Sequence, residues 1–266
     1  MHSHTRWFIY VLLLAFVLFL GIFFHIKINE PSDYVVVPVS IPEHATYYKE
    51  VTIDTTEHYA SFDIHYPQFT KTNIAFNKEI ASIVENARSS FSRDAEDNWK
   101  AYREINFESG DPGQYPSDPY RLSITWDKTT IDARYISFIM RISGYNGGAH
   151  GFENIVSFNY DIVQQKEITL ADLFPNDPDY LKTISEYSRA SLKTQLIENG
   201  SSMNTGENVG NDFEGSTDPM LLAGTEPTLE NFSVFTFTPS EITFYFTQYQ
   251  VAPYVAGEQQ VVMLRK

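Results

Sequence analysis

The chain has 266 residues, of which 42% are hydrophobic and 15% aromatic, and its formal net charge is −15. This charge disfavours nucleic acid and anionic lipid surfaces as partners and suits a cationic one, although solubility alone would also account for it. Because the chain has no cysteine, disulfides, thiolate metal sites and a cysteine nucleophile are excluded.

An apolar run from Trp7 to Phe24 stands near the N-terminus. At about 1.5 Å per residue it is long enough to cross the hydrocarbon core of a bilayer. No small-residue cleavage site follows it, which favours an uncleaved anchor over a signal peptide. We therefore expect a transmembrane helix within residues 1–28, an extended linker at 29–46 and an extracytoplasmic domain at 47–266, with the protein in the cell membrane.

Alternation of apolar and polar residues predicts the strands of the domain. Each such segment is bounded by residues that are typical of turns. The strands are expected at residues 47–53, 59–66, 121–126, 136–142, 156–162, 232–237, 242–246 and 259–264, with turns at 54–57 and 127–130.

Helical periodicity replaces alternation in two long segments. Residues 72–99 have one apolar and one charged face, with Asn73 or the residue before it as the N-cap. Thr169 starts a capping-box pattern that predicts one helical turn. Asp177 is expected to cap a second long helix with Pro178 at its first position. The expected fold class is α+β, an antiparallel sheet with two main helices packed on it.

Two polar stretches, residues 108–119 and 198–218, predict loops. The second has few apolar residues, and we expect it to be mobile and dispensable for folding. Its acidic and amide side chains could hold calcium, but their spacing fits no EF-hand loop, and a solvated loop is the better interpretation.

A glycine-rich stretch at residues 141–152 joins two predicted strands. Glycine permits positive φ there and lets a ligand approach the backbone closely. The candidate binding residues are Tyr145, Asn146, Gly147, Gly148 and His150. His150 could equally lock the turn by bonding a backbone carbonyl, and a tight connection alone would require the glycines.

A second polar and aromatic segment, residues 248–257, follows the C-terminal hairpin. Its Tyr249, Pro253 and Tyr254 are candidate binding residues, although the tyrosines could equally cover the end of the sheet. Loops at strand ends are where a rigid sheet presents functional groups. We therefore expect this segment and the glycine-rich turn to lie together and form one binding face.

No motif for catalysis is present. The chain lacks Gly-x-Ser-x-Gly and His-Glu-x-x-His, and the glycine-rich stretch lacks the Gly-Lys-Ser/Thr of a phosphate loop. We expect no enzyme activity, no cofactor and no metal. A cell-wall glycan hydrolase using an unidentified pair of carboxylates is the alternative, which a buried carboxylate pair in a deep cleft would favour.

Four landmarks of the chain resemble a known extracytoplasmic family. They are Tyr66-Pro67, the turn from Tyr145 to His150, the segment from Ile168 to Phe174 and the segment from Tyr249 to Gly257. Together they resemble the domain shared by RsiV-type anti-sigma factors and PdaC-type peptidoglycan deacetylases, over residues 47–266. The resemblance implies an α+β fold, a role in the cell envelope and, as in RsiV-type members, the binding of lysozyme.

The chain also differs from both groups of relatives. Only six residues precede the apolar run, and the family domain reaches the end of the chain. We therefore expect neither a cytoplasmic anti-sigma domain nor a deacetylase domain. The expected protein is a binding module on a membrane stalk, whose partner is a cationic protein such as lysozyme or cell-wall glycan.

Overall fold

The computed structural model describes residues 47–108, 119–147, 150–198 and 219–265. The predicted anchor and linker, most of the two predicted polar loops, and Gly148 lie outside these ranges. Within them, no helix is both long enough and apolar enough to cross a membrane.

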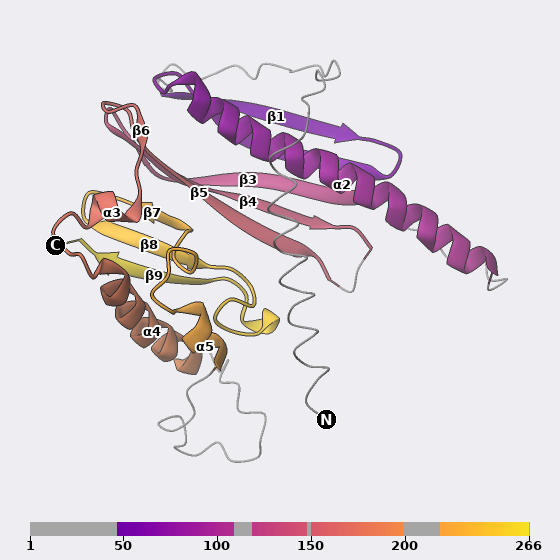
Figure 1. Cartoon of the computed structure of the whole chain (residues 1–266). Coiled ribbons are helices and arrows are strands. Elements are labelled where there is room, and N and C mark those ends of the chain that lie inside the picture. The colour runs from indigo at the N-terminus through magenta and orange to yellow at the C-terminus, as the bar shows by residue number, and fades with distance from the viewer. Residues whose placement is uncertain (1–46, 109–118, 148–149, 199–218, 266) are drawn as a thin grey trace, which may run out of the picture. The chain divides into compact units, whose positions relative to one another are not determined.

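Six strands form the larger sheet, in the order β1-β2-β3-β4-β5-β6 (Figure 1). All neighbouring strands are antiparallel except β2 and β3, which are parallel because the long helix α2 carries the chain back between them. The strands are β1 (Tyr48–Thr56), β2 (Ala60–Phe69), β3 (Tyr120–Ile131), β4 (Tyr135–Tyr145), β5 (Phe152–Asp161) and β6 (Lys166–Glu167).

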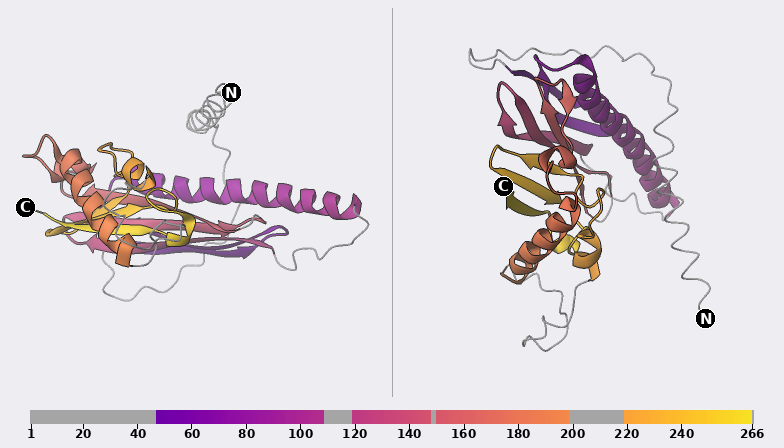
Figure 2. Two further views of the ribbon diagram at one scale, coloured as in Figure 1. Left: turned by 90° about the horizontal axis from the view of Figure 1, so that it is seen from below. Right: turned by 60° about the vertical axis from the view of Figure 1, so that its left-hand side comes forward.

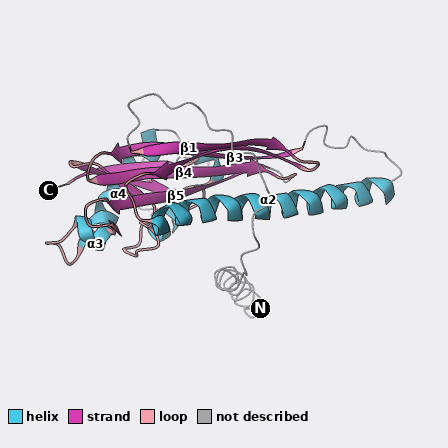
Figure 3. Cartoon of the chain, turned by 90° about the horizontal axis from the view of Figure 1, so that it is seen from above, coloured by secondary structure: helices cyan, strands magenta, loops and turns pink. Residues whose placement is uncertain are grey.

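Helix α2 (Ile74–Glu108) lies along one face of this sheet (Figure 3). Asn73 caps it as predicted, because its side-chain oxygen accepts a hydrogen bond of 2.9 Å from the amide of Phe76. The apolar face of the helix and the alternate residues of β2 to β5 form one buried core. Its fully buried members include Phe62, Ile64, Ile80, Leu122, Ile124, Phe138 and Tyr160.

The smaller sheet has three antiparallel strands in the order β7-β8-β9. Helix α4 packs against β9 (Figure 2) and closes a second core rich in phenylalanine. The elements of this part are α3 (Leu170–Leu173), α4 (Tyr180–Glu198), α5 (Pro219–Gly224), β7 (Phe235–Phe237), β8 (Glu241–Phe246), the 3-10 helix η3 (Tyr254–Ala256) and β9 (Gln259–Leu264).

Side chains of the larger sheet join it to the free edge of β7. They bond the backbone N–H and C=O groups of Phe235 and Phe237, which no other strand in the described ranges pairs on that edge. The four residues are Thr130, Ser137, Ser157 and Asn159, at distances of 2.8 to 3.1 Å. Ser137 also donates to the Asn159 side-chain oxygen at 2.7 Å. This set, called the polar joint below, satisfies backbone groups that burial would otherwise leave unpaired.

The α+β class is confirmed, but the expectation of one antiparallel sheet carrying both helices is wrong. The two sheets are separate, with α2 on the larger and α4 on the smaller. Alternation within a strand predicts which of its residues share a face, but it does not predict which strands hydrogen-bond to each other.

Two predicted boundaries also need correction. Residues 127–130 are not a turn, because β3 continues to Ile131 through an irregularity in the ladder. The turn follows at Asp132, whose carboxylate accepts hydrogen bonds of 2.7 Å from the amides of Arg134 and Tyr135. The first hairpin likewise turns after Thr56 rather than at 54–57.

Helix α4 begins at Tyr180, two residues later than predicted. The Asp177 carboxylate closes a turn before the helix by accepting from the amide of Asp179 at 3.0 Å, so Pro178 lies in that turn. The capping box at Thr169 is confirmed, because its side chain and that of Asp172 each bond the other's backbone amide.

Candidate functional site

The glycine-rich turn between β4 and β5 lies against the segment that follows β8. The rings of His150 and Tyr254 stack with centroids 4.4 Å apart and planes 29° apart. The Tyr249 ring lies 5.6 Å from that of Tyr254. The structure therefore brings together the two segments that the sequence predicts to share a face, and we call these three rings the aromatic row.

Gly147 is required by the conformation of the turn. Its φ is +94°, and a Cβ there would lie 2.7 Å from the hydroxyl oxygen of Tyr120. The adjacent carbonyl of Asn146 accepts a hydrogen bond of 2.8 Å from the Asn98 side chain on α2. Helix α2 and β3 therefore fix the turn from one side, and Asn146 contributes its backbone to that fixation.

His150 bonds a backbone carbonyl, which is one of the two roles that the sequence left open. Its Nδ1 lies 2.8 Å from the carbonyl oxygen of Gly151, and since a carbonyl only accepts, Nδ1 carries the proton. This bond orients an exposed imidazole so that its ring lies over Tyr254.

The second segment is fixed from within by Gln250. Its side-chain amide donates to the carbonyls of Gly224 and Asn231, and its oxygen accepts from the amide of Thr247. These bonds hold Tyr249 at a φ of +68°, which costs a non-glycine residue about 1 kcal/mol or more. The strained residue is 55% exposed. Residues held in strained backbone conformations cluster at functional sites.

A groove of about 390 Å³ lies between the two segments. The strand register places Ser123 opposite Ser143 and Arg121 opposite Tyr145, on the sheet face away from α2. Glu153 continues the first of these rows on β5. The groove is lined by these five residues and also by Gly144, Gly151, Phe152, Gln248 and Tyr254.

Arg141 connects the groove to the segment that carries Tyr254. Its guanidinium bonds both carboxylate oxygens of Glu258 and also approaches Asp127 at 3.3 Å and Glu153 at 3.6 Å. The hydrogen bond to Glu258 raises the pKa of Arg141, which therefore stays charged. Glu258 follows η3, so this ion pair fixes the chain next to Tyr254.

Sequence reasoning found part of this site. It named Tyr145, which is 47% exposed, and Pro253, which forms the N-cap of η3. It missed Arg121, Ser123 and Gln248. Alternation along β3 indicates that the first two share a face, but whether that face is open depends on long-range packing.

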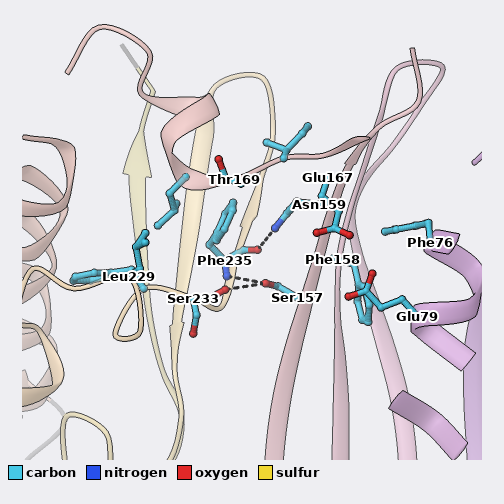
Figure 4. A pocket seen from close by; sticks show the side chains of 13 residues that line it. Phe76, Glu79, Ser157, Phe158, Asn159, Glu167, Thr169, Leu229, Ser233 and Phe235 are labelled. Atoms are coloured by element: carbon cyan, nitrogen blue, oxygen red, sulfur yellow. Dashed lines mark hydrogen bonds between the residues drawn. The ribbon is translucent and has the colours of Figure 1, made fainter. Parts of the chain in front are cut away.

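A second pocket, of about 290 Å³, contains a pair of carboxylates (Figure 4). They belong to Glu79 of α2 and Glu167 of β6, and both side chains are exposed. The pair is therefore not the buried pair that would favour a hydrolase. In the residues that the structure covers, no three His, Asp or Glu side chains gather as metal ligands.

Comparisons with known proteins agree with the fold. Peptidoglycan-N-acetylmuramic acid deacetylase PdaC of Bacillus subtilis (strain 168) is 28% identical over 165 residues. The match covers 62% of this chain but 32% of that protein, so the chain spans about a third of its relative's length. A solved structure of a DUF3298-family protein from Bacteroides fragilis NCTC 9343 has a TM-score of 0.54 at 17% identity, covering 83% of this chain and 90% of that one.

Two family models match successive parts of the chain. Residues 53–153 match the model described as deacetylase PdaC, and residues 171–266 match the model described as a protein of unknown function, DUF3298. Both descriptions agree with the curated relative and the solved structure above. The chain therefore contains regions that match the PdaC and DUF3298 models, which supports the family that the resemblance predicts.

Proposed function

We propose that the chain is a non-catalytic binding module of the cell envelope. In this proposal Trp7 to Phe24 anchors it in the membrane, residues 47–266 lie outside the cytoplasm, and the groove binds cell-wall glycan. The observation that carries the proposal is the lining of the groove, to which Tyr254, Ser123 and Ser143 all contribute. A pyranose ring has an apolar face and a hydroxyl rim, which an aromatic ring and small polar groups match.

The charges at the groove favour binding over hydrolysis. Glycoside hydrolysis uses two carboxylates on either side of the bond to be cleaved. Glu153 is the single acidic residue among those that line the groove, and it lies 3.6 Å from Arg141. The curated relative is named for an action on peptidoglycan, which supports this class of ligand.

Sedimentation with purified peptidoglycan tests the proposal. Detergent-solubilised full-length protein should co-sediment, and Tyr254→Ala should reduce the bound fraction by about tenfold if the ring makes a hot-spot contact. Tyr187→Ala is the matched control, because Tyr187 is an exposed tyrosine on α4 outside the groove. Equal loss in both variants, or no co-sedimentation of the unchanged protein, would refute the glycan assignment.

A cationic protein such as lysozyme is the second candidate partner. The net charge of −15 favours it, because long-range attraction speeds the encounter with a basic partner. Binding should weaken as salt rises from about 50 to about 300 mM, and Tyr145→Ala should reduce it without unfolding the domain. Lysozyme binding that is insensitive to salt would exclude this electrostatic explanation.

A further inference from the structure

The groove contains a positive charge that the proposed function does not use. Arg121 of β3 lines it, whereas the ion-pair partner of Arg121, Asp63 at 2.7 Å, is not among the lining residues. Arg121 lies directly across from Tyr145 on β4, and its side chain is 66% exposed. The other charged residue of the lining, Glu153, lies 3.6 Å from Arg141. The groove therefore presents a guanidinium to the molecule that occupies it.

A series of side-chain hydrogen bonds holds this guanidinium in place. Its Nη2 donates to Oδ2 of Asp63 at 2.7 Å, and Oδ1 of Asp63 accepts from Nε2 of His65 at 3.1 Å. With Nε2 protonated, Nδ1 of the neutral imidazole accepts from the hydroxyl of Thr52 at 3.3 Å. The residues come from the three neighbouring strands β1, β2 and β3. Because these bonds already restrict Arg121, it loses little further freedom when it binds a ligand.

The guanidinium retains donors for a ligand. Arginine has five N–H donors in a planar fork, and within the described residues Arg121 uses Nη2 alone, for Asp63. The hydrogen bond from Arg121 also lowers the pKa of Asp63, so the acceptor stays ionised and the pair stays formed. The planar fork suits a carboxylate, which accepts two parallel hydrogen bonds from it. A carboxylate in the groove can therefore bond Arg121 without displacing Asp63.

We propose that Arg121 binds a carboxylate attached to a sugar of the glycan, so that the groove prefers acidic glycan to neutral glycan. This preference rests on the proposed function, because it requires a glycan in the groove. Arg121 and Tyr254 both line the groove, and its volume of about 390 Å³ lies within the range of small-molecule sites. The net charge of −15 opposes an anionic ligand at a distance. At physiological salt that repulsion is largely screened beyond about 8 Å, whereas direct contact with Arg121 is not.

Glycan strands that have been freed of their stem peptides test this contact, because removal of the peptides leaves carboxylates on the sugars. Carbodiimide coupling with ammonia then converts these carboxylates into neutral amides and leaves the rings intact. In calorimetry, detergent-solubilised full-length protein should bind the untreated strands about tenfold more tightly than the amidated strands. Arg121→Gln should abolish that preference and leave binding to the amidated strands unchanged. Failure of both forms to bind would refute glycan binding itself, whereas equal binding of both would refute only the carboxylate contact.

Arg134→Gln is the matched control. Arg134 is also an exposed arginine in an ion pair, with Asp161 at 3.6 Å, but it lies outside the groove, so this variant should keep the full preference. Arg121→Lys keeps the charge but loses the planar fork, and it should keep only part of the preference. Neither variant of Arg121 should lower the thermal midpoint, because the side chain is exposed.

Competition experiments identify the group that Arg121 binds. Glucuronate should displace the untreated strands from the unchanged protein but should not affect binding of the amidated strands to Arg121→Gln. Displacement by inorganic phosphate at a lower concentration than glucuronate would overturn the choice of a carboxylate. Displacement by isolated stem peptides as effectively as by free strands would overturn its assignment to a sugar. Equal loss of preference in Arg121→Gln and Arg134→Gln would exclude Arg121 as the contact.

Discussion

The core beneath α2 and the joint between the two sheets are both buried, but different interactions stabilise them. Under α2 the contacts are apolar and often aromatic, as where Phe138 and Phe158 stack with centroids 4.8 Å apart. At the joint, the buried Ser137 and Asn159 bond the backbone of Phe235 and Phe237. Apolar packing depends mainly on volume, whereas each hydrogen bond of the joint depends on one atom in one position.

The comparison indicates that the core provides most of the stability, whereas the joint fixes which residues of β7 face the larger sheet. A slip of β7 by one residue would leave its N–H and C=O groups facing the wrong side chains in a buried setting. Leaving a buried polar group unpaired costs about 1–3 kcal/mol. The joint therefore selects one arrangement of the two sheets.

The largest expected effect is in the core. Phe138→Ala removes a ring that is 0% exposed and touches three other aromatic rings, and we expect a loss of about 3–5 kcal/mol in the free energy of unfolding. Urea denaturation followed by far-ultraviolet circular dichroism measures it. Leu264→Ala, at a position 67% exposed on β9, should change stability by less than about 0.5 kcal/mol. Similar losses in both variants would contradict the description of this core.

The stability that the joint contributes should depend on its hydrogen-bonding groups rather than on side-chain volume. Asn159→Leu keeps a similar volume but leaves the Phe235 carbonyl and the Ser137 hydroxyl without this partner, so we expect a loss of about 2–3 kcal/mol. Asn154→Leu is the control, because Asn154 is exposed on the same strand. If Asn159→Leu were neutral, the joint would be held by apolar contact alone.

The two segments of the proposed binding face permit a comparison between two glycines with positive φ. Gly147→Ala should cost about 2 kcal/mol, because φ is +94° and the new Cβ would meet the buried Tyr120. Gly257→Ala, where φ is +69° and nothing lies within 4 Å of the new Cβ, should cost about half as much. Thermal unfolding of both variants gives the difference, and equal costs would show that Tyr120 does not constrain the turn.

The smallest expected effect is a dependence on acid pH in the part of the chain that carries the smaller sheet. The hydrogen bond from Lys166, followed by that from the Thr169 amide, lowers the pKa of Asp172 to about 2. A lowered pKa means that this carboxylate contributes stability above its ordinary value of 3.8, which is lost as pH falls towards 2. Asp172→Asn should remove that part of the pH dependence of the unfolding midpoint. An unchanged profile between pH 2 and pH 4 would show that the capping box does not contribute.

Strong periodicity made much of the fold predictable. The last strand was predicted at its observed bounds, Gln259–Leu264, and Asn73 is one of the two residues predicted as the helix cap. The turn at Asp132 was missed because the four polar residues before it also resemble a turn, although their side chains are tolerated at the exposed end of β3. Two separate sheets were not foreseen, since Ser137 and Asn159 have the polarity of surface residues but lie buried at the joint.

The site was predictable where tyrosine and glycine are concentrated in the sequence. The proximity of His150 to Tyr254 follows from that concentration, because both lie in loops that leave strand ends. The ion pair between Arg141 and Glu258 could not be predicted from the sequence, because the two residues are 117 positions apart. No local pattern encodes such a contact.

The polar joint covers the free edge of β7, and this bears on how the two matched regions of the chain fit together. An unpaired strand edge invites pairing with any other exposed strand, and covering it with side chains removes that hazard without fusing the two sheets. The PdaC model ends at Glu153 and the DUF3298 model begins at Ala171, so most of β5 lies outside both. Ser157 and Asn159 lie in that unmatched strand. The segment between the two matched regions thus carries two of the four residues of the polar joint, and exchanging either region for a relative's would require matching β5 to its new neighbour.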